Sequence, residues 1–233
     1  MAISVVIPAY KEEKNIQRTI ARVRDYIQKR GGGEVLVVVD GSPDRTEELS
    51  RRAEARVISY FPNRGKGYAV RRGLAEAVGE AILFMDADSS TDIAELDRLL
   101  PYLEIGCDVV VGSRFLDPET IKRKQTPWRR LLGRAGRLLC MTLLRLPVVD
   151  TQCGFKLFTR RAAKILVPRM TIDRWGFDME LLTIARIHGL RIQEVPVLWY
   201  DSQHSAVNPL RDAIATLVEL LTIFIHRLRG HYR

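Results

Sequence analysis

The chain is poor in cysteine: Cys107, Cys140 and Cys153 are the three in 233 residues, and they lack the spacing of metal ligands. This excludes a disulfide scaffold and indicates buried free thiols in a reducing compartment. The first residues, MAISVVIPAY, lack a charged leader and a long apolar run, so we expect no signal peptide. Repeats and low-complexity segments are also missing. The apolar content of 46%, with alternating strand and helix patterns, favours one well-filled core.

Two nucleotide-binding signatures are absent as well. No GxGxxG follows the first predicted strand, and the glycine-rich run 63–67 (NRGKG) lacks the Walker spacing. Its glycines would still let Lys66 and backbone N–H groups approach an anion. Acidic residues are outnumbered, since 28 Asp and Glu against 37 Lys and Arg leave a net charge of +9. Such a balance favours phosphate-rich partners: nucleic acid, an anionic membrane surface or a phosphorylated small molecule.

Short apolar segments alternate with amphipathic ones through the first half of the chain. The pattern predicts helices at 12–30 and 92–103, a further helix ending at Val78, and strands at 3–7, 35–39, 56–59, 81–85 and 108–111. Pro8 is expected to end the first strand. This alternation indicates a single α/β domain with a mostly parallel sheet, in which ligands bind beyond the carboxyl ends of the strands.

An acidic pair follows the fourth predicted strand. Asp86 and Asp88 are separated by one residue, so in an extended chain their side chains point the same way and can converge on one point. Carboxylate oxygens are the ligands that Mg²⁺ and Mn²⁺ prefer, with water and substrate phosphates completing the shell. Acidic pairs also close strands and cap helices, so this motif alone leaves both interpretations open.

Several motifs together resemble a known family. In order along the chain they are VIPAYKEE (6–13), VVDGSPDRT (38–46), NRGKGYAVRRG (63–73), MDADSST (85–91), GSR (112–114) and DTQCGFKLF (150–158). This order resembles that of family-2 inverting glycosyltransferases with the Rossmann-like GT-A fold. DTQCGFKLF and the later RWGFDMELL (174–182) are similar to the dolichyl-phosphate and polyprenyl-phosphate branch, and to dolichyl-phosphate β-glucosyltransferases in particular. The resemblance covers about residues 3 to 200.

The resemblance implies roles for matched residues. Asp86 and Asp88 would hold the metal, Mg²⁺ or Mn²⁺, and the nucleoside diphosphate sugar would contact Asp86 together with Pro8, Tyr10, Glu12, Asp40 and Lys66. The implied catalytic residues are Asp88, Asp150 and Arg114, with Asp178 a second candidate base after Asp150. Two positions depart from the family pattern: Val39 stands where many relatives have an acid, and Ser90 where mannosyl-type relatives often have Gln or His.

A lipid phosphate acceptor is already anionic at pH 7 and would need basic residues more than a strong base. Basic residues are dense after the GSR motif, and we expect Arg114, Arg129, Arg130 and Arg134 to contact the acceptor phosphate. A solvated basic face is the alternative.

Two segments have the pattern of helices that lie in a membrane interface. Within 128–146, arginines form one helical stripe and apolar residues another, although a core helix with snorkelling arginines would look similar. The segment 206–233 is apolar and then basic, and it is too short in apolar residues to span a bilayer. We therefore expect a catalytic domain at 1–205, a membrane-associating helix at 206–233 and peripheral attachment at the cytoplasmic membrane face.

The function predicted from these features is metal-dependent, inverting transfer of a hexose, glucose from UDP-glucose, onto dolichyl or polyprenyl phosphate. The alternatives are mannose transfer from GDP-mannose, a soluble transferase with a saccharide acceptor, and a non-catalytic basic module that binds membranes or nucleic acid. We expect no nucleic-acid partner, because such binding would not explain carboxylates at strand ends. The sequence leaves open whether a membrane-anchoring partner assists.

Overall fold

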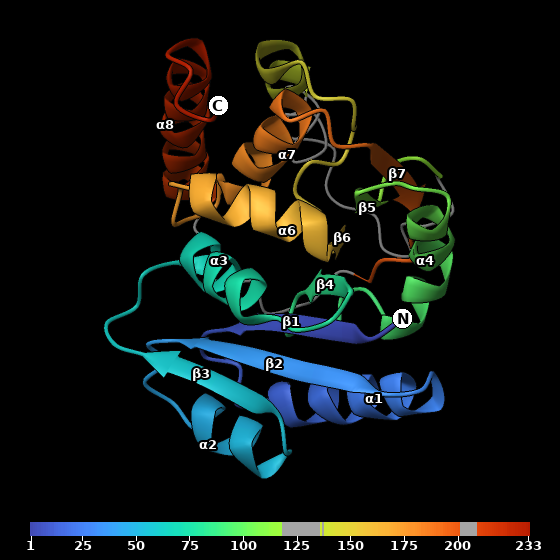
Figure 1. The fold of residues 1–233 in the computed structure, drawn as a ribbon. Coiled ribbons are helices and arrows are strands. Elements are labelled where there is room, and N and C mark those ends of the chain that lie inside the picture. The colour runs from blue at the N-terminus through green and yellow to red at the C-terminus, as the bar shows by residue number, and fades with distance from the viewer. Residues whose placement is uncertain (118–135, 137, 201–208) are drawn as a thin grey trace.

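The computed structural model describes residues 1–117, 136, 138–200 and 209–233. Its core is a seven-stranded sheet in the order β3-β2-β1-β4-β6-β5-β7 (Figure 1). The strands are β1 (Ile3–Ala9), β2 (Gly33–Asp40), β3 (Arg56–Tyr60), β4 (Ala81–Met85), β5 (Val109–Ser113), β6 (Phe155–Thr159) and β7 (Ile192–Pro196). All neighbours pair in parallel except β6, which is antiparallel to both β4 and β5. The predicted mostly parallel α/β sheet is confirmed.

The first strand is longer than predicted. Pro8 does not end it, because β1 continues to Ala9 and Pro8 lies opposite Val38 of β2. On the other side β4 pairs only with the stretch from Ile3 to Val6. The part of β1 that contains Pro8 therefore has one paired edge, where a residue without an N–H is tolerated.

The helices differ from prediction mainly at their starts. They are α1 (Ile16–Lys29), α2 (Thr46–Arg52), α3 (Lys66–Glu76), α4 (Leu96–Glu104), α6 (Arg160–Leu166), α7 (Phe177–Ile187) and α8 (Pro209–Leu228), with 3₁₀ turns η1 (Ile93–Glu95) and η3 (Val167–Arg169). The helix predicted from 12 begins at Ile16, because a turn at the Glu12 carbonyl precedes it. The helix predicted from 92 opens as η1, which Asp92 caps by accepting a hydrogen bond from the Ala94 amide at 2.9 Å.

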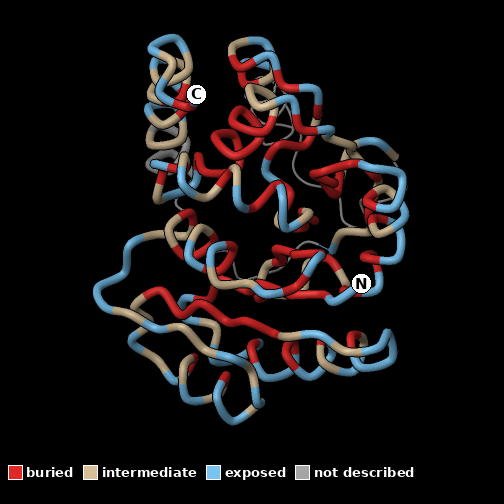
Figure 2. The backbone as a smooth tube through the Cα atoms, in the orientation of Figure 1, coloured by how far each residue is buried: buried red, intermediate tan, exposed pale blue. Residues whose placement is uncertain are grey.

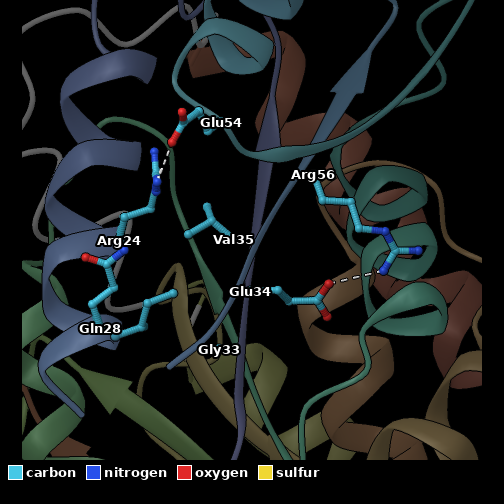
Figure 3. Close-up of a pocket in the computed structure, with 8 residues that line it drawn as sticks. Arg24, Gln28, Gly33, Glu34, Val35, Glu54 and Arg56 are labelled. Carbon is cyan, nitrogen blue, oxygen red and sulfur yellow. Dashed lines mark hydrogen bonds and ion pairs between the residues drawn. The ribbon is translucent and has the colours of Figure 1, made fainter. Parts of the chain in front are cut away.

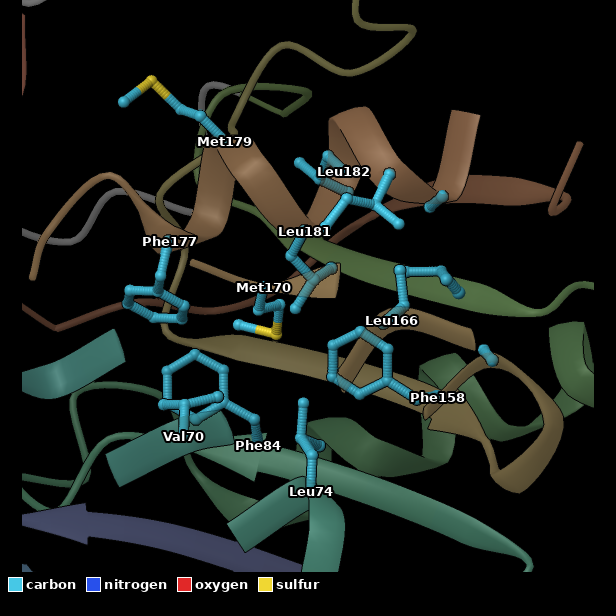
Figure 4. Packing of buried hydrophobic residues seen from close by; sticks show 14 of the residues in the cluster. Val70, Leu74, Phe84, Phe158, Leu166, Met170, Phe177, Met179, Leu181 and Leu182 are labelled. Atoms are coloured by element: carbon cyan, nitrogen blue, oxygen red, sulfur yellow. The ribbon is translucent and has the colours of Figure 1, made fainter. Parts of the chain in front are cut away.

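Helices cover both faces of the sheet. The apolar stripe of α1, at Ile16, Ile20, Val23 and Ile27, packs with α4 against one face. On the other face α3, α6, α7 and α8 enclose a second cluster, in which Phe84 of β4 meets Phe177 of α7 (Figure 4). Buried backbone follows the strands and the inner sides of these helices (Figure 2). The sheet is thus a rigid central layer whose carboxyl edge carries the loops.

The C-terminal helix is part of this second cluster. Leu220, Ile223 and Tyr232 are buried against it, so one side of α8 packs on the body of the protein. Of the helix predicted at 128–146, residues 136 and 138–144 are helical, and 128–135 and 137 lie outside the described residues. The helix ends before the predicted 146, because Arg145 is in a turn with a positive φ of 52°. No helix in the described part of the chain has the length and apolarity needed to cross a membrane.

Candidate active site

Most of the predicted site residues gather at one edge of the sheet. Asp40 ends β2, Asp86 directly follows β4 and Arg114 directly follows β5, all at the carboxyl ends of parallel strands. Glu12 follows β1, and Lys66 begins α3. The topology therefore brings these side chains to the edge where ligands bind in open α/β sheets.

Lys66 and Asp86 form an ion pair at the centre of this edge. The Lys66 Nζ lies 2.6 Å from Asp86 Oδ1, and it lies 5.5 Å from the ring centroids of both Phe84 and Trp175. Burial would lower the pKa of Lys66, but the carboxylates of Asp86 and Asp178 outweigh it and hold that pKa above its usual value. Lys66 therefore stays charged beside Asp86.

The Asp86 carboxylate is packed tightly from below. A Cβ added at Gly154 would lie 2.0 Å from Asp86 Oδ2, so a larger residue there would displace the carboxylate. The Asp86 amide donates to the Gly154 carbonyl at 3.0 Å. The glycine of the CGFK sequence thus fixes the position of Asp86.

Two further carboxylates lie near Asp86. Asp88 accepts a hydrogen bond from the Ser90 amide at 2.9 Å, and Glu12 accepts one from the Asn15 side chain at 3.0 Å. Burial raises the pKa of Glu12 above its usual value, and the charges of Asp88 and Asp86 raise it further. The negative charges of Asp86 and Asp88 therefore act on Glu12, and a cation bound to the pair would lower the pKa of Glu12 again.

The chemistry of this donor set fits a divalent metal. Among the described residues no group of three or more His, Cys, Asp or Glu side chains has the arrangement of a complete metal site. Mg²⁺ and Mn²⁺ often use only one or two protein carboxylates and take their other ligands from water and substrate phosphates. Asp86 and Asp88 supply such a pair.

Arg114 is held by Asp150. The guanidinium donates from Nε and Nη2 to the two carboxylate oxygens at 2.8 Å each, and the Arg114 amide donates at 3.0 Å. Burial would raise the pKa of Asp150, but Arg114 holds it below its usual value. Glu194 of β7 accepts the amides of Val149 and Asp150 at 2.8 Å, which fixes this turn. The Arg114 guanidinium lies 5.4 Å from the ring centroid of Trp199.

Asp178, the second candidate base, is buried in an ion pair with Lys156. The Lys156 ammonium also donates to the Cys153 carbonyl at 2.6 Å. Burial raises the pKa of Asp178 above its usual value, against the opposing effect of Lys156 and Lys66. Sequence reasoning assigned no role to Lys156 or to Trp175. A lysine inside the otherwise apolar strand FKLFT was the available signal, because a buried ammonium requires a partner.

Asp40 is buried and bound to the loop before α3. Its carboxylate accepts hydrogen bonds from the Arg64 amide at 2.7 Å and from the Gly65 amide and Asn63 side chain at 2.8 Å.

Pro8 is buried in β1, and Tyr10 is exposed beyond it. Contact of these two residues and of Asp40 with a nucleoside stays a prediction. Arg129, Arg130 and Arg134 lie outside the described residues.

A separate pocket lies away from these residues. It measures about 350 Å³ and is lined by the start of β2, the C-terminal half of α1 and the start of β3, at the opposite edge of the sheet (Figure 3). Its two arginines are paired within the protein, Arg24 with Glu54 at 2.5 Å and Arg56 with Glu34 at 3.1 Å. This pocket holds none of the predicted site residues, so the carboxyl edge remains the candidate site.

Comparison with known proteins identifies the family of this chain. Residues 4–166 match the family described as glycosyl transferase family 2. The human dolichyl-phosphate beta-glucosyltransferase is 35% identical over 251 residues, covering 99% of this chain and 77% of that protein. A dolichyl-phosphate beta-glucosyltransferase of Trichomonas vaginalis is 35% identical over 241 residues, covering 97% of this chain and 71% of that protein.

Solved structures share the fold. Glucosyl-3-phosphoglycerate synthase from Mycobacterium tuberculosis, in complex with phosphoglyceric acid, superposes with a TM-score of 0.72 at 23% identity, covering 95% of this chain and 79% of that one. The same enzyme has been crystallised with Mn²⁺, UDP and glucosyl-3-phosphoglycerate (TM-score 0.69, 23% identity, 95% and 79% coverage). Together with the family match, this shows that the chain belongs to glycosyltransferase family 2 and is a glycosyltransferase with the GT-A fold.

Proposed function

We propose that this enzyme transfers glucose from UDP-glucose to dolichyl or polyprenyl phosphate, with inversion at the anomeric carbon and with a bound Mg²⁺ or Mn²⁺. The observation that carries the proposal is the similarity, at 29–36% identity over nearly the whole chain, to proteins named dolichyl-phosphate beta-glucosyltransferase. The charges at the carboxyl edge supply the chemistry that such a transfer needs.

The donor side of the reaction requires stabilising a departing diphosphate. Asp86 and Asp88 would hold the metal, which when bound supplies positive charge to the leaving phosphates. Lys66 and Arg114 place two further cations at the same edge of the sheet. Charges that are already in position stabilise the transition state without reorganisation, most strongly where water is excluded. Asp150 keeps Arg114 in position.

The acceptor side needs little base catalysis. A lipid phosphate oxygen is anionic at neutral pH, so it can attack the anomeric carbon directly while the bond to the diphosphate breaks, which inverts that centre. Asp150 is already engaged by Arg114, and Asp178 by Lys156. We infer that Asp150 orients Arg114 and does not accept a proton from the acceptor.

A transfer assay tests the proposal. Purified protein is incubated with Mn²⁺ or Mg²⁺, polyprenyl phosphate and either labelled UDP-glucose or labelled GDP-mannose. We expect label to enter the organic phase only from UDP-glucose, and only with metal. If label enters the organic phase only from GDP-mannose, the transferred sugar is mannose and not glucose. Full activity in excess chelator, or in an Asp88→Ala variant of intact fold, would refute the metal site.

Attachment to a membrane is part of the proposal. The side of α8 that faces away from the body has an apolar stripe, the outer stripe, formed by the exposed residues Leu217, Val218, Leu221, Ile225 and Leu228. Basic residues follow at its C-terminal end, including the exposed Arg229 and Arg233. This combination favours insertion at an anionic interface, at the cytoplasmic face where the nucleotide sugar would be available. Sedimentation with anionic vesicles, weakened by high salt, is expected; no binding to any vesicle would refute it.

A further inference from the structure

Lys66 occupies one oxygen of a carboxylate that is a candidate metal ligand. Its ammonium lies 2.6 Å from Asp86 Oδ1, in direct contact with one of the two carboxylates that fit a divalent cation. Both ammonium and metal are positive, and both seek the same carboxylate oxygens. They cannot share Asp86 without strong mutual repulsion.

The backbone that carries Lys66 cannot move away easily. Lys66 lies between Gly65 and Gly67, and a Cβ at either position would lie within 2.5 Å of a backbone carbonyl oxygen, that of Asp173 or Ile172. The amide of Tyr68, in the same first turn of α3, donates to the Asp173 carbonyl at 3.0 Å. Rotation of its own side chain is therefore the simplest way for Lys66 to leave Asp86.

The other cations of the site are already engaged. Lys156 is paired with Asp178, and Arg114 binds Asp150 through two hydrogen bonds from its guanidinium. Among the ion pairs of the described residues, the one between Lys66 and Asp86 directly neutralises the acidic pair. Lys66 thus supplies the positive charge that a metal would supply to Asp86.

We propose that Lys66 is an internal substitute for the divalent cation, so that metal binds productively only together with the nucleoside diphosphate. The diphosphate oxygens offer Lys66 a new anionic partner, and its departure opens Asp86 to the metal. This inference rests on the proposed metal and donor sites, and it adds an order of binding and the residue that sets it.

Mn²⁺ binding tests the order without measuring activity. Free Mn²⁺ is measured by electron paramagnetic resonance with protein alone and with protein plus UDP, after correction for the Mn²⁺ that UDP binds in solution. For the unmodified protein we expect UDP to tighten Mn²⁺ binding at least tenfold. In Lys66→Met we expect Mn²⁺ alone to bind about tenfold more tightly than in the unmodified protein, and the effect of UDP to shrink.

A matched control and a second variant keep the test sharp. Lys29→Met removes an exposed ammonium at the end of α1, near the opposite edge of the sheet, and should leave both affinities unchanged. Lys66→Gln is a second variant without the ammonium, in case Lys66→Met does not fold. Circular dichroism checks that both variants are folded. Equal Mn²⁺ affinity with and without UDP, or no gain in either Lys66 variant, would overturn this inference alone. Absence of Mn²⁺ binding in every condition would overturn the proposed metal site as well.

Discussion

At the scale of single residues, the ion pair between Asp150 and Arg114 is largely buried and extensively hydrogen-bonded. Asp150 is 1% exposed, and three hydrogen bonds from Arg114 reach its carboxylate. Asp150→Asn should lower kcat about 100-fold with little change in KM for UDP-glucose, because Arg114 would lose its orientation toward developing charge. It should also cost about 3 kcal/mol of stability, because one partner of a buried ion pair is removed.

Asp108 provides the control for this prediction. Its carboxylate is also buried, accepts Arg161 at 3.1 Å and the Arg191 amide at 3.0 Å, and stands at the amino end of β5, away from the site. Asp108→Asn should lower the free energy of unfolding but leave kcat near its normal value. Equal losses of kcat in the two variants would mean that Asp150 acts only through stability.

The same pair predicts a pH dependence of stability. Arg114 holds the pKa of Asp150 in the folded protein below its ordinary value of 3.8, so folding favours the ionised form. Its contribution is complete above the unfolded pKa and is lost as the pH falls through the folded one. The stability difference between the unmodified protein and Asp150→Asn should therefore be constant from pH 7 to pH 5 and shrink below about pH 4. Urea unfolding at each pH measures it, and a difference that grows on acidification would contradict the assignment.

At the scale of elements, a hydrogen bond connects the described part of α8 to the segment beside the site. Glu219 of α8 accepts the Gly176 amide at 2.7 Å, in the segment that leads from Trp175 into α7. Glu219→Ala should leave that amide without its acceptor and cost about 1–3 kcal/mol. We also expect a several-fold rise in KM for UDP-glucose, since Trp175 lies beside Lys66.

Glu219→Gln separates this contact from helix packing. Glutamine keeps an acceptor oxygen at the same position, so its KM and unfolding free energy should stay close to normal. If the glutamine variant loses as much stability and donor affinity as the alanine variant, the charge of Glu219 matters and the hydrogen bond does not. If KM is unchanged in both, α8 has no influence on the donor site.

Strand and helix patterns explain which elements could be predicted. The place of the acidic pair could be predicted, because Asp86 directly follows a five-residue apolar strand. The extended conformation assumed for the pair was not found, because Ala87 and Asp88 lie in a turn after the strand. The antiparallel β6 could not be predicted, since the residues from Phe155 to Thr159 carry no sign of which strands they will join. Pro8 misled for a related reason: its tolerance depends on where the pairing with β4 stops.

The ion pairs of the site could not be predicted from the sequence either. The pairs of Lys66 with Asp86 and of Arg114 with Asp150 join residues 20 and 36 positions apart, and only the sheet order brings them together. Family resemblance named all four residues without saying that they contact one another. Lys156 was visible as an unusual lysine in a strand, but its partner Asp178 was not. Tertiary contacts thus decided the electrostatics of the site.

At the scale of the whole molecule, α8 presents apolar surface on two sides. The inner side, with Leu220 and Ile223, is buried in the core, while the outer stripe stays open to solvent. An exposed stripe of this length at the surface of a basic protein favours a partner that is both apolar and anionic. A bilayer interface containing acidic lipids has both properties.

Leu221→Asp, at the centre of the outer stripe, should therefore weaken binding to anionic vesicles at least tenfold and leave stability nearly unchanged. It replaces an apolar side chain that is proposed to insert into the bilayer with a carboxylate that the negative surface would repel. Ile105→Asp makes the same change at a residue that is 63% exposed beyond the end of α4, and it should bind vesicles normally. Co-sedimentation at low and high salt measures both. UDP binding in solution should be equal in the two variants, because the proposed donor site at the carboxyl edge of the sheet contains neither residue. Normal vesicle binding by Leu221→Asp would assign the outer stripe to another partner.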